Sequence, residues 1–440
     1  MVGSSHFNRK KDDFMLDSLV SSLITWFNTL TDPNLKPLEP LAWEKSAIFQ
    51  PPSQRSDRLS EAIVGAYLQN LQQRGIAPEG QGIWIESDWV TPISNQGKTP
   101  LPAASLTKIA TTLASLNKWG AKHQFETNIY ITGEIIAGVV MGDLLVEGSG
   151  DPFLVWEEAI AIANTLNRLG ISEVRGNLLI TDKFYMNYRD RALDSGELFK
   201  QALNRQLWQS EVTKQYLQMP DGTKQPEIAI AGEVKAIAEV PSQAQLLITH
   251  QSLPLAEILR QMNIYSNNKM AQILADLLGG AAAVARSSAE IADFDPTEIE
   301  LVNGSGLSED NRISPHAASQ MLMAIDRLLV KDAMTAADLF PTAGRDRVGT
   351  VQGRVLPAGT TIKTGTLNNV SALAGIIPTG DRGNVYFSII NYGRQTDYFR
   401  QQQDTLVNQL AAGQIVPLDS NLAVEPEWYL GDPQRNRVYY

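Results

Sequence analysis

The chain has 440 residues, of which 43% are hydrophobic and 19% are charged, a composition typical of a globular protein with two or three domains. Its net charge of −11 argues against a nucleic-acid partner, because a polyanion is bound by clustered lysines and arginines. The chain contains no cysteine, which excludes disulfides, thiolate metal ligands and a cysteine nucleophile.

The four histidines, His6, His123, His250 and His316, show none of the spacings that bind zinc. We therefore expect no metal and no other cofactor. Counting residues does not exclude a Ser-His-Asp triad, but no histidine lies in a recognisable catalytic motif.

No segment has the run of about 20 apolar residues that forms a membrane span. In the N-terminal segment, residues 1–54, Leu19–Leu30 is the best candidate for a targeting sequence. It is short, contains Ser, Thr and Asn, and lacks a clear small-residue cleavage site. It is compatible with a poor signal, an amphipathic helix at a membrane surface or a first core helix.

The first predicted elements lead to a long helix near residue 105. Apolar residues repeat with helical spacing over Ser60–Gln73, and Gly82–Glu86 alternates like a strand. Ser105–Trp119 is a helical pattern that Gly120 ends. Ser105 then stands at the helix N-terminus, where free N–H groups and the helix dipole favour a developing anion.

The next block alternates strands with a helix. Strands are predicted over Ile129–Gly138, Gly142–Glu147 and Gly176–Thr181, and an amphipathic helix over Glu157–Leu169. This βαβ-like order predicts a domain inserted into a split parent domain. Residues 185–245 are polar and weakly patterned, and the pattern assigns them no element.

The last part of the chain returns to helices and then to strands. Helices are predicted over Leu255–Met262 and Met270–Leu278, and Ser314-Pro315 opens a further helix as its N-cap and first residue. Val370–Ile377 and Val385–Asn391 resemble paired strands.

Three short motifs follow one another along the chain: Ser105-Leu106-Thr107-Lys108, Ser266-Asn267-Asn268 and Lys363-Thr364-Gly365. In this order they are typical of serine acyl-transfer enzymes of the penicillin-recognising kind. The pattern Ser-x-x-Lys is weak evidence alone, because it also begins at Ser115 and at Ser266.

The first motif offers a nucleophile and a base. A serine hydroxyl is a poor nucleophile at neutral pH unless a base takes its proton. Lys108 lies one helical turn from Ser105 and can serve if burial, or a cation such as Lys363, lowers its pKa. The N–H of Ser105, with that of Thr366 as a second donor, would stabilise the acyl oxyanion.

The other two motifs offer proton transfer and substrate binding. Ser266 can relay a proton to the leaving amine, and Asn268 can hold the substrate or the base lysine. Lys363 and Thr364 place a cation and a hydroxyl on a strand, and Gly365 lets a substrate backbone approach. We therefore predict a substrate that ends in a free carboxylate.

Each motif also has a purely structural explanation. Ser115 and Lys118, near the helix end, are interpreted as surface residues. Ser266-Asn267-Asn268 alone is compatible with a helix N-cap, and Lys363-Thr364-Gly365 alone with a turn at an edge strand. All three in order, each at a suitable element, favour the catalytic interpretation.

The chain resembles the serine-type D-alanyl-D-alanine carboxypeptidases of the penicillin-binding-protein-4 class, peptidase family S13. Beyond the three motifs, the resemblance rests on the following segments: Gly142-Asp143-Leu144, Gly148-Ser149-Gly150-Asp151-Pro152, Asn303–Ser308 with Asn311-Arg312 and Ser314, and Ala343-Gly344. It extends over roughly residues 55–400.

The resemblance implies an α+β fold. Its main part is a penicillin-binding transpeptidase-like domain, in which helices flank an antiparallel sheet beside a helical subdomain, and a smaller α/β domain is inserted into it. The expected limits are 55–124 and 246–416 for the split catalytic domain, 125–245 for the insert and 417–440 for an irregular polar tail.

The resemblance also implies an activity and its residues. The protein would be a hydrolase that trims peptidoglycan stem peptides at D-Ala-D-Ala, facing the periplasm or cell wall, with β-lactams as inhibitors. Ser105 would be acylated, Lys108 would be the general base, and Ser266 and Asn268 would relay protons and hold substrate. Lys363 and Thr364 would bind the terminal carboxylate, and the N–H groups of Ser105 and Thr366 would form the oxyanion hole. Thr364, Gly365 and Thr366 together would line the substrate.

Two further positions concern the side chains of the substrate. Asp151 resembles the acid of the inserted domain that meets the stem peptide, whereas Glu309 stands where the family often has arginine. Endopeptidase cleavage of cross-links uses the same machinery. A β-lactamase-like hydrolase and a catalytically silent peptidoglycan-binding protein are the alternatives.

Overall fold

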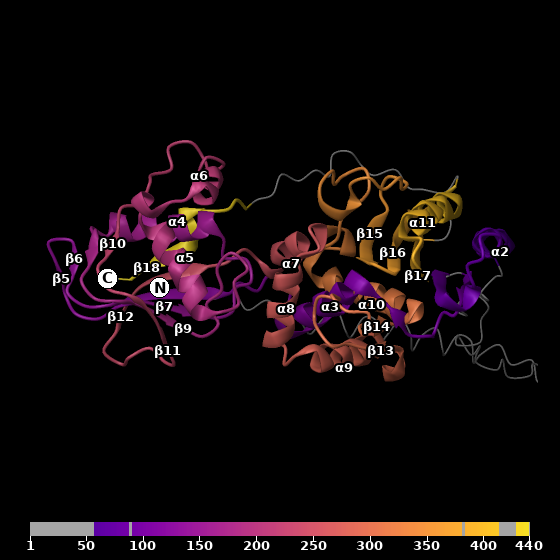
Figure 1. Ribbon diagram of the computed structural model, residues 1–440, viewed down its shortest axis with the longest axis horizontal. Helices are drawn as coiled ribbons and strands as arrows, with labels where there is room; N and C mark the ends of the chain where they lie inside the picture. Colours follow the sequence, from indigo (N-terminus) through magenta and orange to yellow (C-terminus); the bar gives the residue numbers. More distant parts are fainter. Residues whose placement is uncertain (1–56, 88–89, 381–382, 413–427, 440) are drawn as a thin grey trace, which may run out of the picture. The chain divides into compact units, whose positions relative to one another are not determined.

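The computed structural model describes residues 57–87, 90–380, 383–412 and 428–439. An antiparallel five-stranded sheet of order β15-β16-β17-β1-β2 joins early and late parts of the chain (Figure 1). Its strands are β1 (Gln81–Ser87), β2 (Val90–Asn95), β15 (Thr361–Leu367), β16 (Val370–Thr379) and β17 (Gly383–Tyr392). The two strands predicted after the third motif are therefore confirmed, and they pair with each other.

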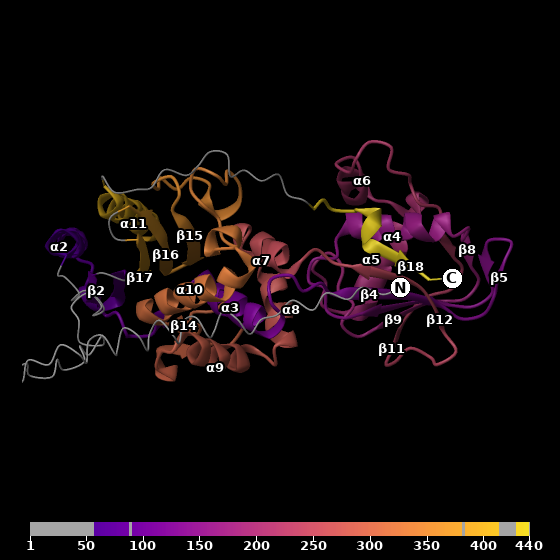
Figure 2. The ribbon, with the colours of Figure 1, turned by 180° about the vertical axis from the view of Figure 1, so that it is seen from behind.

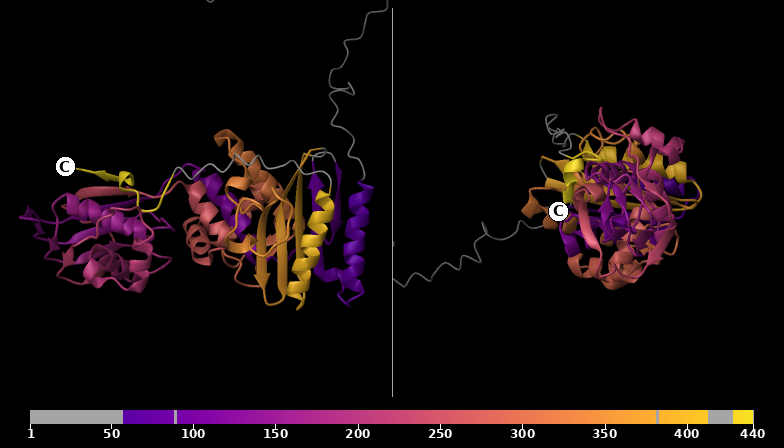
Figure 3. Two further views of the ribbon diagram at one scale, coloured as in Figure 1. Left: turned by 90° about the horizontal axis from the view of Figure 1, so that it is seen from above. Right: turned by 90° about the vertical axis from the view of Figure 1, so that its left-hand side faces the viewer.

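Helices cover both faces of this sheet, because successive side chains along a strand point to opposite faces. On one face, α2 (Arg58–Gln72) and α11 (Thr396–Ala411) pack over a core that includes Leu373 and Phe387. Figure 3 shows α11 in yellow along the orange strands. On the other face, Ala372 belongs to a larger core formed with the remaining helices.

These remaining helices form one group in which α3 contacts each of the other four (Figure 2). They are α3 (Thr107–Trp119), α7 (Leu255–Ile264), α8 (Asn268–Leu277), α9 (Ala281–Ala292) and α10 (Pro315–Leu329). Every residue of α3 from Thr107 to Leu116 is buried. Ser314 caps α10, because its Oγ accepts the Ala317 N–H and Pro315 is the first helical residue, as predicted.

A small three-stranded sheet lies beside the start of α3. Its order is β13-β14-β3, with β13 (Ile299–Glu300), β14 (Arg312–Ile313) and β3 (Leu101–Pro102). Because β14 pairs with β3, the loop over residues 301–311 is held next to the turn that precedes α3.

Between α3 and α7 the chain builds a separate core around a sheet of order β11-β9-β7-β4-β12-β18. Its strands are β4 (Glu126–Ile131), β7 (Leu144–Gly148), β9 (Leu178–Thr181), β11 (Val234–Ile237), β12 (Gln245–Gln251) and β18 (Asn436–Val438). The parallel strands β7 and β9 are joined by α4 (Trp156–Arg168), which is the expected βαβ arrangement. The α+β class is confirmed.

A second, smaller sheet of order β10-β8-β6-β5 belongs to the same block. Its strands are β5 (Ile135–Ile136), β6 (Val139–Val140), β8 (Glu173–Val174) and β10 (Ala229–Ile230). The segment 185–245, to which the sequence pattern assigned no element, holds β10 and β11 together with α5 (Ala192–Leu203) and α6 (Ser210–Tyr216).

The expected N-terminal segment, residues 1–54 with Leu19–Leu30, lies outside the described residues. Among the residues that are described, no helix is long and apolar enough to cross a membrane.

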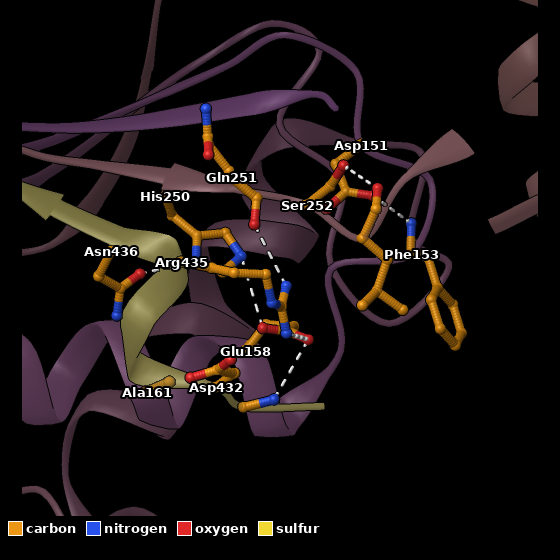
Figure 4. Close-up of polar contacts among 12 residues, drawn as sticks. Asp151, Phe153, Glu158, Ala161, His250, Gln251, Ser252, Asp432, Arg435 and Asn436 are labelled. Atoms are coloured by element: carbon orange, nitrogen blue, oxygen red, sulfur yellow. Dashed lines mark hydrogen bonds and ion pairs between the residues drawn. The ribbon is translucent and has the colours of Figure 1, made fainter. Parts of the chain in front are cut away.

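The C-terminal residues add an edge strand to the inserted block, where an irregular segment was expected. The strand β18 pairs antiparallel with β12, with Asn436 opposite His250. Just before it, the buried Arg435 guanidinium forms an ion pair with the buried carboxylate of Glu158 on α4 (Figure 4). Arg435 also donates to the carbonyl oxygens of Gln251 and Tyr429. The strand is short and polar, so its sequence lacks the alternation by which strands are predicted.

The histidine in this cluster is uncharged at neutral pH. Burial, and then the charge of Arg435, lower the pKa of His250 to about 4. Its Nδ1 lies 2.7 Å from the Asn436 side-chain oxygen. The positive charge that compensates Glu158 is therefore that of Arg435.

Arg435→Ala should destabilise the inserted block, because it leaves the Glu158 carboxylate buried without its cation. Breaking a buried pair in this way costs about 3–5 kcal/mol of unfolding free energy. Thermal or urea unfolding measures the loss. Arg437→Ala is the control, since Arg437 is exposed on the same strand, and it should cost less than about 0.5 kcal/mol. Equal stability of the two variants would contradict this role for the ion pair.

Candidate active site

Ser105 lies in a tight turn that leads into α3. The turn is a single 3-10 segment, Ala104–Leu106, and α3 itself begins at Thr107, two residues later than the helix start expected from the sequence. Ala104 has φ 47°, which is a strained conformation for a residue with a side chain. The Thr107 hydroxyl donates to the Ala104 carbonyl oxygen over 2.9 Å and fixes the turn. Ser105 therefore stands, half-buried, at the N-terminal end of α3.

Lys108 points back to Ser105 from the first turn of α3. Its Nζ donates to Asn268 Oδ1 over 2.7 Å and to the Ser305 carbonyl oxygen over 2.6 Å, and it lies 3.1 Å from Ser105 Oγ. The side chain is fully buried. Burial, and then the nearby charge of Lys363, lower the pKa of Lys108 to about 6. At neutral pH its amine has a lone pair that can accept a proton.

In the second motif the middle residue caps a helix, and the two outer residues contact the lysines of the site. Asn267 is the N-cap of α8, because its Oδ1 accepts the N–H groups of Lys269 and Met270. Ser266, with φ 52°, is held in the left-handed region. The two outer residues are thereby left for the site, where Asn268 meets Lys108 and Ser266 meets Lys363.

Lys363 lies on the edge strand β15, on the face of the sheet that carries Ala374 and α3. Its Nζ donates to Ser266 Oγ over 3.1 Å and to the Thr364 carbonyl oxygen over 3.0 Å. The side chain is fully buried, and burial lowers its pKa to about 7.

Gly365 lets this strand approach the nucleophile turn. A Cβ at position 365 would lie 2.8 Å from the Ala103 carbonyl oxygen and 3.1 Å from the Ser105 nitrogen. Since real Cβ atoms avoid such distances, any other residue would push β15 away from the turn. Gly365 thus lets β15 lie directly against the turn that carries the Ser105 nitrogen.

The loop over residues 301–311 contributes contacts that residue-by-residue reasoning did not foresee. Asn303 Oδ1 accepts the N–H groups of Ser305 and Gly306 and the Ser305 hydroxyl. This network holds the loop in the conformation in which the Ser305 carbonyl oxygen accepts a hydrogen bond from Lys108 Nζ. Gly306 has φ +86°, and a Cβ there would lie 1.9 Å from the Ala104 carbonyl oxygen. Only the family resemblance singled out this loop, because a backbone carbonyl leaves no mark in the sequence.

The remaining predicted binding residues are placed differently. Thr366 is exposed on β15. Asp151 is buried, its Oδ1 accepts the Phe153 N–H over 2.8 Å, and burial raises its pKa to about 7. Among the described contacts, none joins Asp151 to Ser105 or Lys108.

Glu309 lies against the hairpin that follows the third motif. Its two carboxylate oxygens accept hydrogen bonds from Asn369 Nδ2 and from the Tyr392 hydroxyl, each over 3.1 Å. These two hydrogen bonds hold the Glu309 carboxylate and link the loop 301–311 to the turn between β15 and β16 and to the end of β17.

The prediction that Ser115 is a surface residue is wrong. Ser115 is fully buried and its Oγ donates to the Thr111 carbonyl oxygen over 2.7 Å. The reason is that α3 is surrounded by other helices up to Leu116, so only its last turn reaches solvent. The Ser115 hydroxyl is engaged within the helix, whereas Lys118 is exposed.

No histidine supplies a base to these serines within the described part of the chain. His316 contacts Glu298, and His250 contacts Asn436 and Glu158. The described residues also contain no cluster of His, Asp and Glu suited to a metal ion. The arrangement around Ser105 therefore supports acyl transfer to a serine with a lysine base.

Comparison with known proteins agrees with this chemistry. Residues 88–197 and 218–413 match the D-Ala-D-Ala carboxypeptidase 3 (S13) family. The D-alanyl-D-alanine carboxypeptidase DacB of Haemophilus influenzae is 24% identical over 387 residues, which cover 65% of this chain and 79% of the relative. The D-alanyl-D-alanine carboxypeptidase of Actinomadura sp. strain R39 is 23% identical and covers 73% of this chain and 79% of the relative.

Solved structures show the same fold. A predatory endopeptidase of Bdellovibrio bacteriovorus, acylated by penicillin G, superposes with a TM-score of 0.66 at 23% identity, over 77% of this chain and 94% of the other. Penicillin-binding protein 4 of Haemophilus influenzae gives a TM-score of 0.61 at 20% identity, over 78% and 99%. The expected penicillin-binding type of fold is thus confirmed. The chain belongs to the S13 family of D-Ala-D-Ala carboxypeptidases, which are serine hydrolases.

Proposed function

We propose that this protein is a serine DD-peptidase that cleaves the terminal D-Ala-D-Ala bond of peptidoglycan stem peptides through an acyl-enzyme on Ser105. The observation that carries the proposal is the buried Lys108 amine, 3.1 Å from Ser105 Oγ with its pKa lowered to about 6. A lysine in this state accepts the serine proton at neutral pH.

Acylation follows from the positions of the groups. Ser105 Oγ attacks the carbonyl carbon of the D-Ala-D-Ala bond while its proton passes to Lys108 Nζ. The N–H groups of Ser105 and Thr366 hold the oxyanion of the tetrahedral intermediate. The C–N bond then breaks, and the proton that Lys108 took from Ser105 passes by way of the Ser266 hydroxyl to the leaving D-alanine amine, so that Lys108 is neutral again. Ser266 is held for this step by Lys363.

Deacylation returns the enzyme to its starting state. Water attacks the Ser105 ester while Lys108 takes a proton from it, and the ester C–O bond then breaks as Lys108 returns that proton to Ser105 Oγ, so the shortened peptide leaves as a carboxylic acid. Asn268 keeps the Lys108 amine directed at the serine in both steps, since its Oδ1 accepts from Nζ over 2.7 Å.

The substrate places this protein on the cell-wall side of the membrane, because peptidoglycan is found there. We propose residues 55–124 and 252–416 as its split catalytic domain and 125–251 as the insert, because β12 belongs to the sheet of the insert and the limit of 246 expected from the sequence would divide it. Residues 417–440 are the C-terminal segment, which adds β18 to that sheet. The same machinery serves endopeptidase cleavage of D-Ala cross-links, and the Bdellovibrio structure that shares this fold is described as an endopeptidase. A stem-peptide contact by Asp151 would require its buried side chain to become accessible.

A fluorescent penicillin should label Ser105, because a β-lactam presents the same carbonyl to the same nucleophile. Labelling followed by peptide mapping should give one adduct, which Ser105→Ala abolishes. Ser115→Ala is the matched control, since Ser115 begins the same Ser-x-x-Lys pattern but its hydroxyl is bonded within α3. An unlabelled wild-type protein, or an adduct on any other serine, would contradict the assignment of the nucleophile.

The acylation rate should rise with pH and level off above about pH 6. The pKa of Lys108 is lowered to about 6, so the lysine is a charged ammonium below that pH and cannot accept the serine proton. Stopped-flow acylation by a chromogenic cephalosporin between pH 4.5 and 8.5 measures how the acylation rate increases with pH. A rate that falls across this range, or that is still rising about tenfold per pH unit at pH 8.5 as a base with the ordinary lysine pKa of about 10.4 requires, would exclude Lys108 as the base.

A further inference from the structure

The strand β15 presents two different rows of side chains. Thr364 lies opposite Leu373 and Thr366 opposite Ser371 on β16, and Leu373 belongs to the core that α11 covers. Lys363 and Gly365 lie opposite Ala374 and Ala372, on the face of α3. The two threonines therefore share the face of α11, and the lysine does not.

Lys363 is a poor sole partner for a substrate carboxylate. It is fully buried, and its Nζ already donates to Ser266 Oγ and to the Thr364 carbonyl oxygen. A buried lysine whose pKa is lowered to about 7 carries only part of its charge at neutral pH. A carboxylate beside Thr364 and Thr366 calls for a permanent cation on their own face.

Arg400 supplies a cation at this place. It follows the buried Phe399 near the start of α11, and its Nη2 donates to Thr366 Oγ1 over 3.0 Å. The side chain is 42% exposed, and the ion pair that it forms with Asp397 spans 3.6 Å to a carboxylate that is 91% exposed. Exposed pairs of this kind are weak, so the guanidinium can exchange Asp397 for a ligand.

A second arginine close by shows the contrast. The Arg354 side chain is only 7% exposed and donates to the side chains of Asp404 and Gln403. The charge of Arg400 adds to the effect of burial in lowering the pKa of Arg354, so the two guanidinium groups are neighbours. Arg354 is neutralised inside the protein, whereas Arg400 faces solvent beside Thr366.

We propose that Arg400 is a specificity-determining residue that binds the C-terminal carboxylate of the substrate together with Thr364 and Thr366. The inference deepens the proposed DD-peptidase function and rests on it. Because β15 is an edge strand, a peptide along its open side meets the exposed Thr366 first, and Thr364, which is 9% exposed, lies two residues away on the same face. A guanidinium presents a planar pair of N–H donors that match a carboxylate, and it stays charged at every working pH.

The test compares an acyl-thioester of thiolactic acid, which has a free carboxylate, with its methyl ester, which has none. Arg400→Ala should raise KM for the acid about 10- to 100-fold, the effect of losing one hydrogen bond to a charged group. The kcat for the acid should change less than about threefold, because the contact is made equally in ground and transition states. Both parameters for the methyl ester should stay unchanged.

Two matched variants separate binding from structure. Arg400→Lys should recover part of the affinity for the acid, since it restores the positive charge but not the planar pair of N–H donors of the guanidinium. Arg394→Ala removes an exposed arginine just before α11 and should leave both thioesters unaffected. Equal losses on acid and ester, which a merely structural link between α11 and β15 predicts, would overturn the proposal, as would no loss on the acid. A wild-type protein that cleaves neither thioester would instead contradict the DD-peptidase activity itself.

Discussion

The arrangement of this active site depends on one buried amine. Lys108 has no exposed surface, and its three hydrogen-bond partners come from the turn before α3, from α8 and from the loop 301–311. An ammonium in such a place lacks water and faces the charge of Lys363, so the neutral amine is favoured. The same burial that favours the neutral amine of Lys108 also reduces the free energy of unfolding at neutral pH. Its pKa is lower in the folded than in the unfolded chain, so stability is lost as the pH falls from about 10.4 toward the folded value.

The surrounding fold supplies the rigidity that this arrangement needs. Ala104 and Ser266 both hold left-handed backbone conformations beside the reacting groups, and such strain persists only where the neighbouring structure fixes it. Two glycines at 306 and 365 let backbone segments approach the Ser105 turn more closely than any side chain allows. The loop 301–311 and the strand β15, which are far from residue 105 in the sequence, thereby lie directly against the start of α3.

Much of this could be predicted from the sequence, because the strongest signals are local. The helical spacing of residues 60–73, the Ser314-Pro315 start of α10 and the strand-helix-strand order near residues 142–181 were recognisable and are confirmed. The three motifs predicted the side chains to which we assign the chemistry, and these side chains lie within hydrogen-bonding reach of one another. The features that the sequence did not predict depend on tertiary packing. Ser115 is buried only because other helices surround α3, and β18 is a strand only because β12 offers it an edge. The Ser305 carbonyl is a backbone atom whose role no residue type reveals.

The central claim is that Lys108 is a neutral amine beside Ser105 at physiological pH. Nitrogen NMR of protein labelled at the lysine Nζ tests it most directly, with the Lys108 signal assigned by its absence from Lys108→Arg. The account predicts a titration near pH 6, the value to which burial and Lys363 lower the pKa of Lys108, and therefore a neutral amine signal at pH 7.5. A Lys108 signal that remains that of an ammonium at pH 9 would contradict it.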